Sequence, residues 1–287
     1  MISDITLGQF FPGDSLIHKL DPRMKIILAI LYITCIFVAN NPVSFLLLIA
    51  FTVVLVLISS ISLKTILKGI KPIIFILIFT SLINLFFASN VGEQEPLVQF
   101  YFISIYLDGI YRAIFMSIRV ILLIIGTSIL LTYTTSPIAL TDGIEALLSP
   151  LKVIGVPVHS FAMMMSIALR FIPTLIEETE KIMNAQKSRG ADFSSGGLVK
   201  RAKALIPILV PLFVSAFKRA DELAVAMECR CYRGDKNRTK LVKLCCRAGD
   251  FVMLFVFLIL LGGMITGSIL PYTFDLSGWL YYLFYKF

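Results

Sequence analysis

Ser188-Arg189-Gly190 closes one long helical pattern of this chain, and Cys229-Arg230-Cys231 closes the next. Both triplets lie in a polar interruption that runs from about Thr134 to Asp250 between strongly apolar segments. The interruption holds 17 of the 26 Lys and Arg residues. A basic region between apolar segments is typical of a surface that docks an acidic partner or faces lipid headgroups. The apolar segments on either side predict a membrane anchor for it.

The composition excludes an ordinary soluble domain. Hydrophobic residues make up 58% of the 287 residues, charged residues only 15%, and the mean hydropathy is +0.90. A soluble domain is about half apolar and a quarter charged, so most of this surface must face something other than water. The first residues include an acid and no basic segment, so a cleavable signal peptide is not expected.

Five stretches have the roughly 20 apolar residues that a membrane-spanning helix needs. They are expected at about 24–39, 43–60, 72–89, 109–133 and 251–270. The fold class predicted is an all-α integral membrane protein. Three parts are expected: an amphipathic segment with four spans in 1–133, a cytoplasmic domain of long crossing helices in 134–249, and the fifth span with an aromatic interfacial tail in 250–287.

The charges of the loops predict the orientation. Lys and Arg gather in His18–Lys25, in the Lys64/Lys68/Lys71 face and in 134–249, whereas the loop 90–108 has neither. The positive-inside rule places the basic segments in the cytoplasm, together with the N-terminus. Five spans then leave the C-terminus outside.

Three helices are expected inside the interruption. A short amphipathic one covers Asp142 to Lys152, and longer ones run from Pro157 to about Ser188 and from about Leu198 to Cys231, after a linker at Ser194-Ser195-Gly196-Gly197. Gly190 suits the left-handed residue that ends a helix, which would place Arg189 at the tip.

A stripe of alanines marks the last of these helices. Ala216, Ala220 and Ala224 recur every four residues, on the side opposite Lys218, Arg219 and Glu222. Small residues let a second helix cross at close distance. The alternative is that the alanines are ordinary helix formers.

Arg189 and Arg230 have two interpretations. Each would complement the negative end of its helix dipole, which contributes up to about 1 kcal/mol. However, the two lie 41 positions apart with small neighbours on both sides. Small neighbours let a helix tip enter a groove, where a guanidinium binds a carboxylate through two parallel hydrogen bonds. The repetition favours docking.

Two other features are candidate sites. Arg119 lies deep in the fourth span, deeper than Arg112, so it needs a partner and is a candidate for function; a hydrogen bond to a neighbouring helix is an equal alternative. Cys229 and Cys231 with the pair Cys245-Cys246 suggest zinc, but the spacing is unusual and no His lies nearby, so we interpret these cysteines as small spacers.

The sequence contains no motif of covalent chemistry. It has no glycine-rich phosphate loop with Lys and Ser or Thr, no His-Glu-x2-His pair and no acid pair within a span. A non-catalytic chain with no cofactor or metal of its own is therefore expected. The competing class, a free-standing membrane enzyme acting on lipid headgroups, would need a nucleophile or an acid–base group that does not stand out.

These residues resemble the transmembrane (T) component of the energy-coupling factor transporters, the ABC-type vitamin and metal importers of prokaryotes. The resemblance covers nearly the whole chain. It rests on 12–15 and 18–23, on Leu169-Arg170-Phe171-Ile172-Pro173-Thr174-Leu175, on 185–192, on Ala220-Asp221-Glu222-Leu223-Ala224, and on 226–228 and 232–234. The two Ala-Arg-Gly-like triplets of the family correspond to 188–190 and 229–231, although the second has Cys on both sides of its arginine.

The resemblance implies a transmission subunit in a prokaryotic cell membrane. Each triplet would enter a groove of one of two ABC-type ATPase subunits, which bind the ATP and magnesium. A small membrane protein, the S component, would bind the substrate and pack against a hydrophobic surface of this chain. Vitamin uptake through a shared module is expected, with a dedicated cobalt or nickel importer as the alternative.

Overall fold

The computed structural model describes residues 10–39, 41–86, 98–100, 103–105, 107–191, 193, 197–232, 234 and 244–269. The helices are α1 (Pro22–Val38), α2 (Pro42–Ser59), α3 (Leu63–Ile70), α4 (Ile74–Phe86), α5 (Leu107–Thr127), α6 (Pro137–Leu148), α7 (Val158–Ser188), α8 (Leu198–Cys229) and α9 (Ala248–Ile269). Turns of 3₁₀-helix cover Lys71–Ile73 and Ser149–Ile154, and a π-helix covers Ser128–Tyr133. A short antiparallel hairpin pairs β1 (Val98–Phe100) with β2 (Ile103–Ile105), Val98 facing Ile105.

Among the described residues, five helical segments are long and apolar enough to cross a membrane: Pro42–Ser59, Leu63–Leu85, Gly109–Tyr133, Val158–Ser188 and Ala248–Thr266. The predicted class, an all-α integral membrane protein, is confirmed. Four segments overlap predicted spans, and the second also includes α3, which the 3₁₀ turn Lys71–Ile73 joins to α4. The remaining one is α7, which the sequence placed in the cytoplasm. The predicted first span is the 17-residue helix α1.

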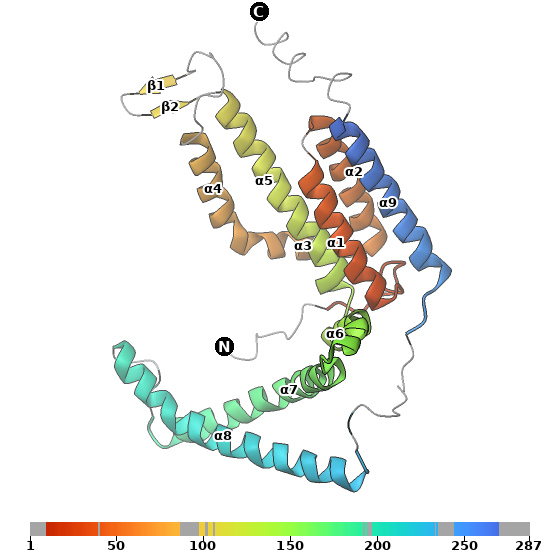
Figure 1. Cartoon of the computed structure of the whole chain (residues 1–287). Helices are drawn as coiled ribbons and strands as arrows, with labels where there is room; N and C mark the ends of the chain where they lie inside the picture. The colour runs from red at the N-terminus through yellow and green to blue at the C-terminus, as the bar shows by residue number, and fades with distance from the viewer. Residues whose placement is uncertain are drawn as a thin grey trace, which may run out of the picture. The chain divides into compact units, whose positions relative to one another are not determined.

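The chain divides into two compact units. One, here called the bundle, comprises 10–136 and the segment from 244 onward, and the other, the arm unit, comprises 137–243. In the bundle, α1 packs against α5 and α9 (Figure 1). The aromatic tail at Trp279, Tyr281, Tyr282 and Tyr285, the linker residues Ser194-Ser195-Gly196 and most of the loop 90–108 lie outside the described residues.

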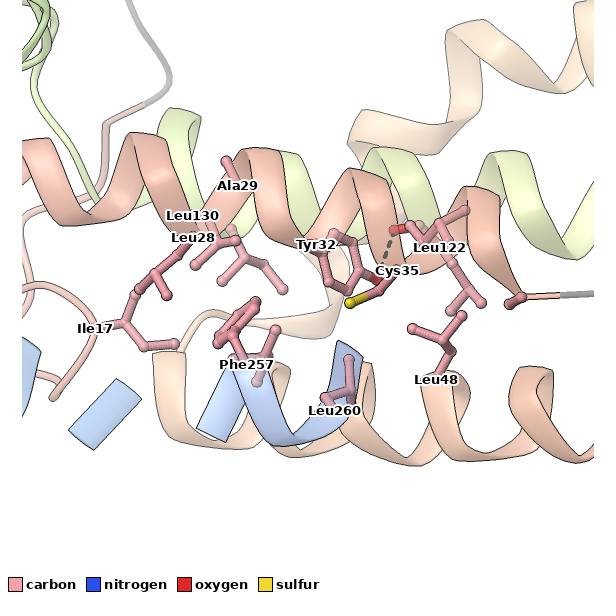
Figure 2. Close-up of a cluster of buried hydrophobic side chains, with 14 of the residues drawn as sticks. Ile17, Leu28, Ala29, Tyr32, Cys35, Leu48, Leu122, Leu130, Phe257 and Leu260 are labelled. Atoms are coloured by element: carbon pink, nitrogen blue, oxygen red, sulfur yellow. Dashed lines mark hydrogen bonds between the residues drawn. The ribbon is translucent and has the colours of Figure 1, made fainter. Parts of the chain in front are cut away.

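Tyr32 lies at the centre of the bundle core (Figure 2). Its ring packs edge-on against Phe257 of α9, with ring centroids 6.5 Å apart. Its hydroxyl donates to the carbonyl of Leu122 at 3.0 Å and bonds the Thr52 hydroxyl at 2.7 Å. Gly126 makes room for the ring, because a Cβ there would collide with it. One side chain thus joins α1, α2, α5 and α9, and its polar atom is satisfied, as a buried hydroxyl requires.

A buried lysine ties α1 to the end of the π-helix. Lys25 is 1% exposed, and its ammonium donates to the carbonyl of Thr134 at 2.8 Å, to the hydroxyl of Thr135 at 3.2 Å and to the carbonyl of His18 at 3.3 Å. Three acceptors match the three N–H donors of the ammonium. This cluster lies just before Ser136, where the chain leaves the bundle.

A buried aspartate holds the point where the chain returns. Asp250, in the first turn of α9, is fully buried and accepts from the backbone N–H of Arg247 at 2.6 Å and of Asp21 at 2.9 Å. Asp21 in turn caps α1 by accepting from the Arg23 N–H at 2.9 Å. A carboxylate in the first turn of a helix also complements the helix dipole. Both connections to the arm unit are therefore anchored to the start of α1.

Candidate functional site

The first triplet forms the C-terminal end of α7. Arg189 is the last, half-helical residue, and Gly190 follows with φ +87°. The Gly190 N–H donates to the Lys187 carbonyl at 2.9 Å, and the Ala191 N–H donates to the Gln186 carbonyl at 3.0 Å. These two bonds define a Schellman motif, which satisfies the last carbonyls of a helix and needs a left-handed residue after the cap. The predicted helix end at Gly190 is confirmed.

The second triplet repeats this geometry at the end of α8. Arg230 is the cap residue, and Cys231 adopts the left-handed conformation with φ +55°. The Cys231 N–H donates to the Glu228 carbonyl at 2.8 Å, and the Tyr232 N–H donates to the Met227 carbonyl at 3.0 Å. A non-glycine residue in this conformation bears a strain of about 1–2 kcal/mol. Despite this strain, the end of α8, with Cys231 in place of a glycine, has the same shape as the end of α7.

Both arginines are exposed, as are the small residues Ser188, Gly190, Cys229 and Cys231 beside them. Within the described part of the chain, neither guanidinium has a hydrogen-bond or ion-pair partner. The two tips thus present the same chemistry: an unpaired guanidinium flanked by small side chains. In each tip, the backbone hydrogen bonds of the Schellman motif hold the turn that carries the arginine.

One carboxylate joins the two helices at their crossing. Glu178 of α7 accepts a hydrogen bond from the guanidinium of Arg219 at 2.8 Å and another from the hydroxyl of Ser215, both on α8. Nearer the end of α7, the Gln186 side chain donates to the Pro207 carbonyl at 3.5 Å. Along the contact, α7 and α8 therefore run in opposite directions, and their C-terminal ends point away from each other (Figure 1).

The arms that extend from this ion pair have equal length. Arg189 follows Glu178 by eleven positions, and Arg230 follows Arg219 by eleven. At 1.5 Å of rise per residue, each tip lies about 16 Å along its helix from the ion pair. Sequence reasoning missed Glu178. The sequence does contain one hint of this pair: Glu178 and Arg219 are 41 positions apart, the same spacing as between Arg189 and Arg230.

The polar bonds at the crossing with α7 come from Ser215 and Arg219, which lie next to the alanine stripe. Ala216 is half-buried, but Ala220 and Ala224 are exposed. The prediction that Arg219 lies on the side away from the crossing is wrong, because its guanidinium pairs with Glu178. The polar bonds of Ser215 and Arg219 orient α8, whereas the alanine periodicity alone cannot select a face. The use of the stripe as a close helix-crossing face stays a prediction.

Arg119 has the partner on a neighbouring helix that the sequence analysis considered. Its guanidinium donates to the carbonyl of Ala39, the C-cap of α1, at 2.8 Å and lies 5.4 Å from the centre of the Phe45 ring. A cation at a helix C-terminus complements the dipole, and a cation over an aromatic face is attracted to its electrons. Arg119 therefore fastens α5 to α1 and α2. Arg112 is exposed.

The cysteines of the arm and of the return segment are free thiols. Cys229, Cys231, Cys245 and Cys246 are all exposed, and Cys35 is buried in the bundle. Among the described residues, no group of three His, Cys, Asp or Glu side chains is arranged to hold a metal ion.

A broad apolar face on α8 is exposed. Phe213 and Phe217, one turn apart, are 61% and 68% exposed, and Leu209, Val210 and Val214 are exposed around them. On α7 the side chains of Phe161, Met164 and Met165 are exposed as well. Apolar patches of this kind indicate an interface with a protein or a membrane.

The amino-acid sequence of this chain is similar to those of known transport proteins. The model of the cobalt transport protein family, CbiQ, matches residues 13–241, which include both triplets. The energy-coupling factor transporter transmembrane protein EcfT of Clostridium kluyveri is 53% identical over 252 residues, covering 88% of this chain and 92% of that protein. The chain belongs to the family of energy-coupling factor T components. Family members named EcfT from Ruminiclostridium cellulolyticum and Bacillus subtilis are 57% and 49% identical over 244 and 245 residues, covering 85% of this chain and 90% and 91% of theirs.

Proposed function

We propose that this T component couples two ABC-type ATPase subunits to a substrate-binding S component. The observation that carries the proposal is the equivalence of the two tips: the same Schellman motif, an exposed unpaired arginine and an equal distance from the Glu178–Arg219 pair. Two equivalent cationic tips suit two related partners, each with a groove that ends in a carboxylate. A single partner or a lipid surface would not require such a repetition.

The ATPase subunits would bind ATP and magnesium, and this chain would have no catalytic group or cofactor. Closure of the ATPase pair would displace the tips, and the crossing would convert that displacement into a movement of α7 and α8. The S component would pack against the apolar face around Phe213 and Phe217. Motion of this face would then reorient the S component in the membrane and release its substrate.

The tips would act in the cytoplasm of a prokaryotic cell, with the N-terminus and 134–249 on the same side. This placement rests on the loop charges of the sequence. It agrees with the exposed thiols at the α8 tip, which a reducing compartment keeps unpaired.

We propose vitamins as the substrate class, delivered by more than one S component. The relatives are named as general energy-coupling factor proteins rather than as subunits for one substrate. A second candidate is a dedicated cobalt importer, which the description of the matching family names. Uptake of labelled vitamins and of cobalt by cells that express the complex separates the two.

The decisive test replaces the tip arginines. Truncating one member of a buried, hydrogen-bonded charge pair costs about 2–5 kcal/mol, whereas loss of a dipole contact costs about 1 or less. Arg189→Ala or Arg230→Ala should each weaken ATPase co-purification and uptake, and the double variant should abolish both. Arg→Lys should rescue only in part, because an ammonium cannot form the planar pair of bonds. Lys218→Ala, at an exposed position on α8, is the control. Wild-type uptake in the double variant would refute the proposal.

A further inference from the structure

An open apolar groove of about 670 Å³ lies between α2, α3 and α5 in the bundle. Its volume is within the range of about 300–1,000 Å³ that is usual for small-molecule sites. The lining side chains are aliphatic except for Thr52, whose hydroxyl bonds Tyr32 and the Leu48 carbonyl, each at 2.7 Å. The groove therefore offers no free polar group to an occupant, which excludes a polar substrate and selects a hydrocarbon.

The helix α3 lines part of this groove and is strongly two-sided. Leu63, Ile66, Leu67 and Ile70 line the groove, although Leu63 and Leu67 are 68% and 64% exposed. The lysines form a separate stripe beside this apolar face: Lys64, Lys68 and, directly after the helix, Lys71. All three are exposed, and none has an ion-pair or hydrogen-bond partner among the described residues.

The position of α3 is fixed by a close approach to the π-helix. A Cβ at Gly69 would lie only 2.5 Å from the hydroxyl of Tyr133, so the backbone of α3 packs directly against that hydroxyl. Figure 1 shows α3 running across α4 and α5 rather than along them. The lysine stripe is consequently held beside a groove that is also lined by the candidate membrane spans α2 and α5.

We infer that this groove binds one acyl chain of an anionic phospholipid, with Lys64 and Lys68 holding the phosphate. The two halves of the site match the two halves of such a lipid: a hydrocarbon wall along the spans, and unpaired cations beside it on α3. Basic side chains beside a span attract anionic headgroups at the cytoplasmic leaflet, the side on which the loop charges place these lysines. The helix of a partner protein could fill an apolar groove but would not account for the lysines. The inference rests on the membrane placement and not on the docking of the tips.

The experiment is native mass spectrometry of the full chain with its co-purified partners in mild detergent. The probes are palmitoyl-oleoyl phosphatidylglycerol and phosphatidylcholine with the same chains. We expect one tightly held phosphatidylglycerol and weaker binding of phosphatidylcholine. Removing the charges in Lys64→Gln with Lys68→Gln should weaken phosphatidylglycerol binding by about fivefold per lysine, since each basic residue contributes about that factor at an anionic surface. Lys203→Gln with Lys218→Gln, two exposed lysines of α8, is the matched control.

A second pair of variants tests the hydrocarbon half. Val53→Trp fills the groove from a residue that is 51% exposed, and Val54→Trp adds the same bulk on α2 at a residue that does not line it. Val53→Trp should weaken the binding of both lipids about tenfold or more, because each buried CH₂ contributes about fourfold; Val54→Trp should not. Equal lipid binding by these two variants, or no headgroup preference, would overturn the inference. Loss of a co-purified membrane subunit from Val53→Trp with lipid binding intact would also overturn it and assign the groove to protein docking.

Discussion

Under the proposed coupling function, we predict that loss of the ion pair at the α7–α8 crossing separates ATP hydrolysis from transport. Glu178 and Arg219 are 21% and 34% exposed, so their bond is partly screened by solvent. Exposed pairs contribute about 0.2–1 kcal/mol, and hydrogen bonds to charged groups contribute about 1.5–3 kcal/mol. Glu178 accepts a second bond from Ser215. We therefore expect a coupling energy of about 1–2 kcal/mol between Glu178 and Arg219.

The assay combines a double-mutant cycle with transport in reconstituted vesicles. Glu178→Ala and Arg219→Ala should each lower the unfolding temperature of the purified complex and reduce substrate uptake per ATP hydrolysed by about fivefold or more, which corresponds to 1 kcal/mol. Both tips remain intact in these variants, so the ATPases should still co-purify. The double alanine variant should be no worse than Glu178→Ala alone, because that change already removes both bonds to the carboxylate and residues in contact are not additive.

Two further variants make this reasoning refutable. The charge-reversed pair Glu178→Arg with Arg219→Glu should recover most of the uptake, since the same two groups meet with exchanged positions. Glu177→Ala, at the exposed position next to Glu178, is the control and should leave uptake unchanged. Additive effects of the two alanine changes, or a charge-reversed pair no better than the single changes, would show that the crossing does not depend on this bond.

Three other outcomes are expected. Cys231→Gly should stabilise the α8 tip by about 1 kcal/mol, and Gly190→Ala should destabilise the α7 tip by a similar amount, because both positions have positive φ; amide hydrogen exchange at the two helix ends measures both, and equal protection in all variants would contradict it. A membrane-impermeant thiol reagent should label Cys229 in inverted vesicles but not in intact cells. Labelling in intact cells would show that the predicted orientation is wrong. Ala220→Leu, on an exposed face, should impair recovery of the complex more than Lys218→Leu does; equal recovery would leave the alanines as ordinary helix formers.

The sequence alone determined the membrane class, most spans and the helix ends at the tips. Such features follow from local rules: a span needs a run of apolar residues, and Gly190 marks a left-handed helix end whatever surrounds it. The left-handed conformation of Cys231 at the second tip is harder to predict from the sequence, since a cysteine does not by itself indicate a positive φ. The motif residues around it carried the family resemblance, which the relatives confirm.

Only the tertiary structure decided which faces meet. The alanine periodicity suggested a crossing at Ala216, Ala220 and Ala224, but contacts 41 positions apart between Glu178 and Arg219 determine the orientation of α8 instead. Arg119 likewise showed its partner, the Ala39 carbonyl, only once α1 and α5 were packed. The apolar side of an amphipathic helix shows roughly where a neighbouring helix packs. The exact rotation of each helix about its own axis is selected by a few specific polar bonds between residues distant in the chain. Such pairs leave no periodic signal in a single sequence, which is why they emerge only when the helices are packed.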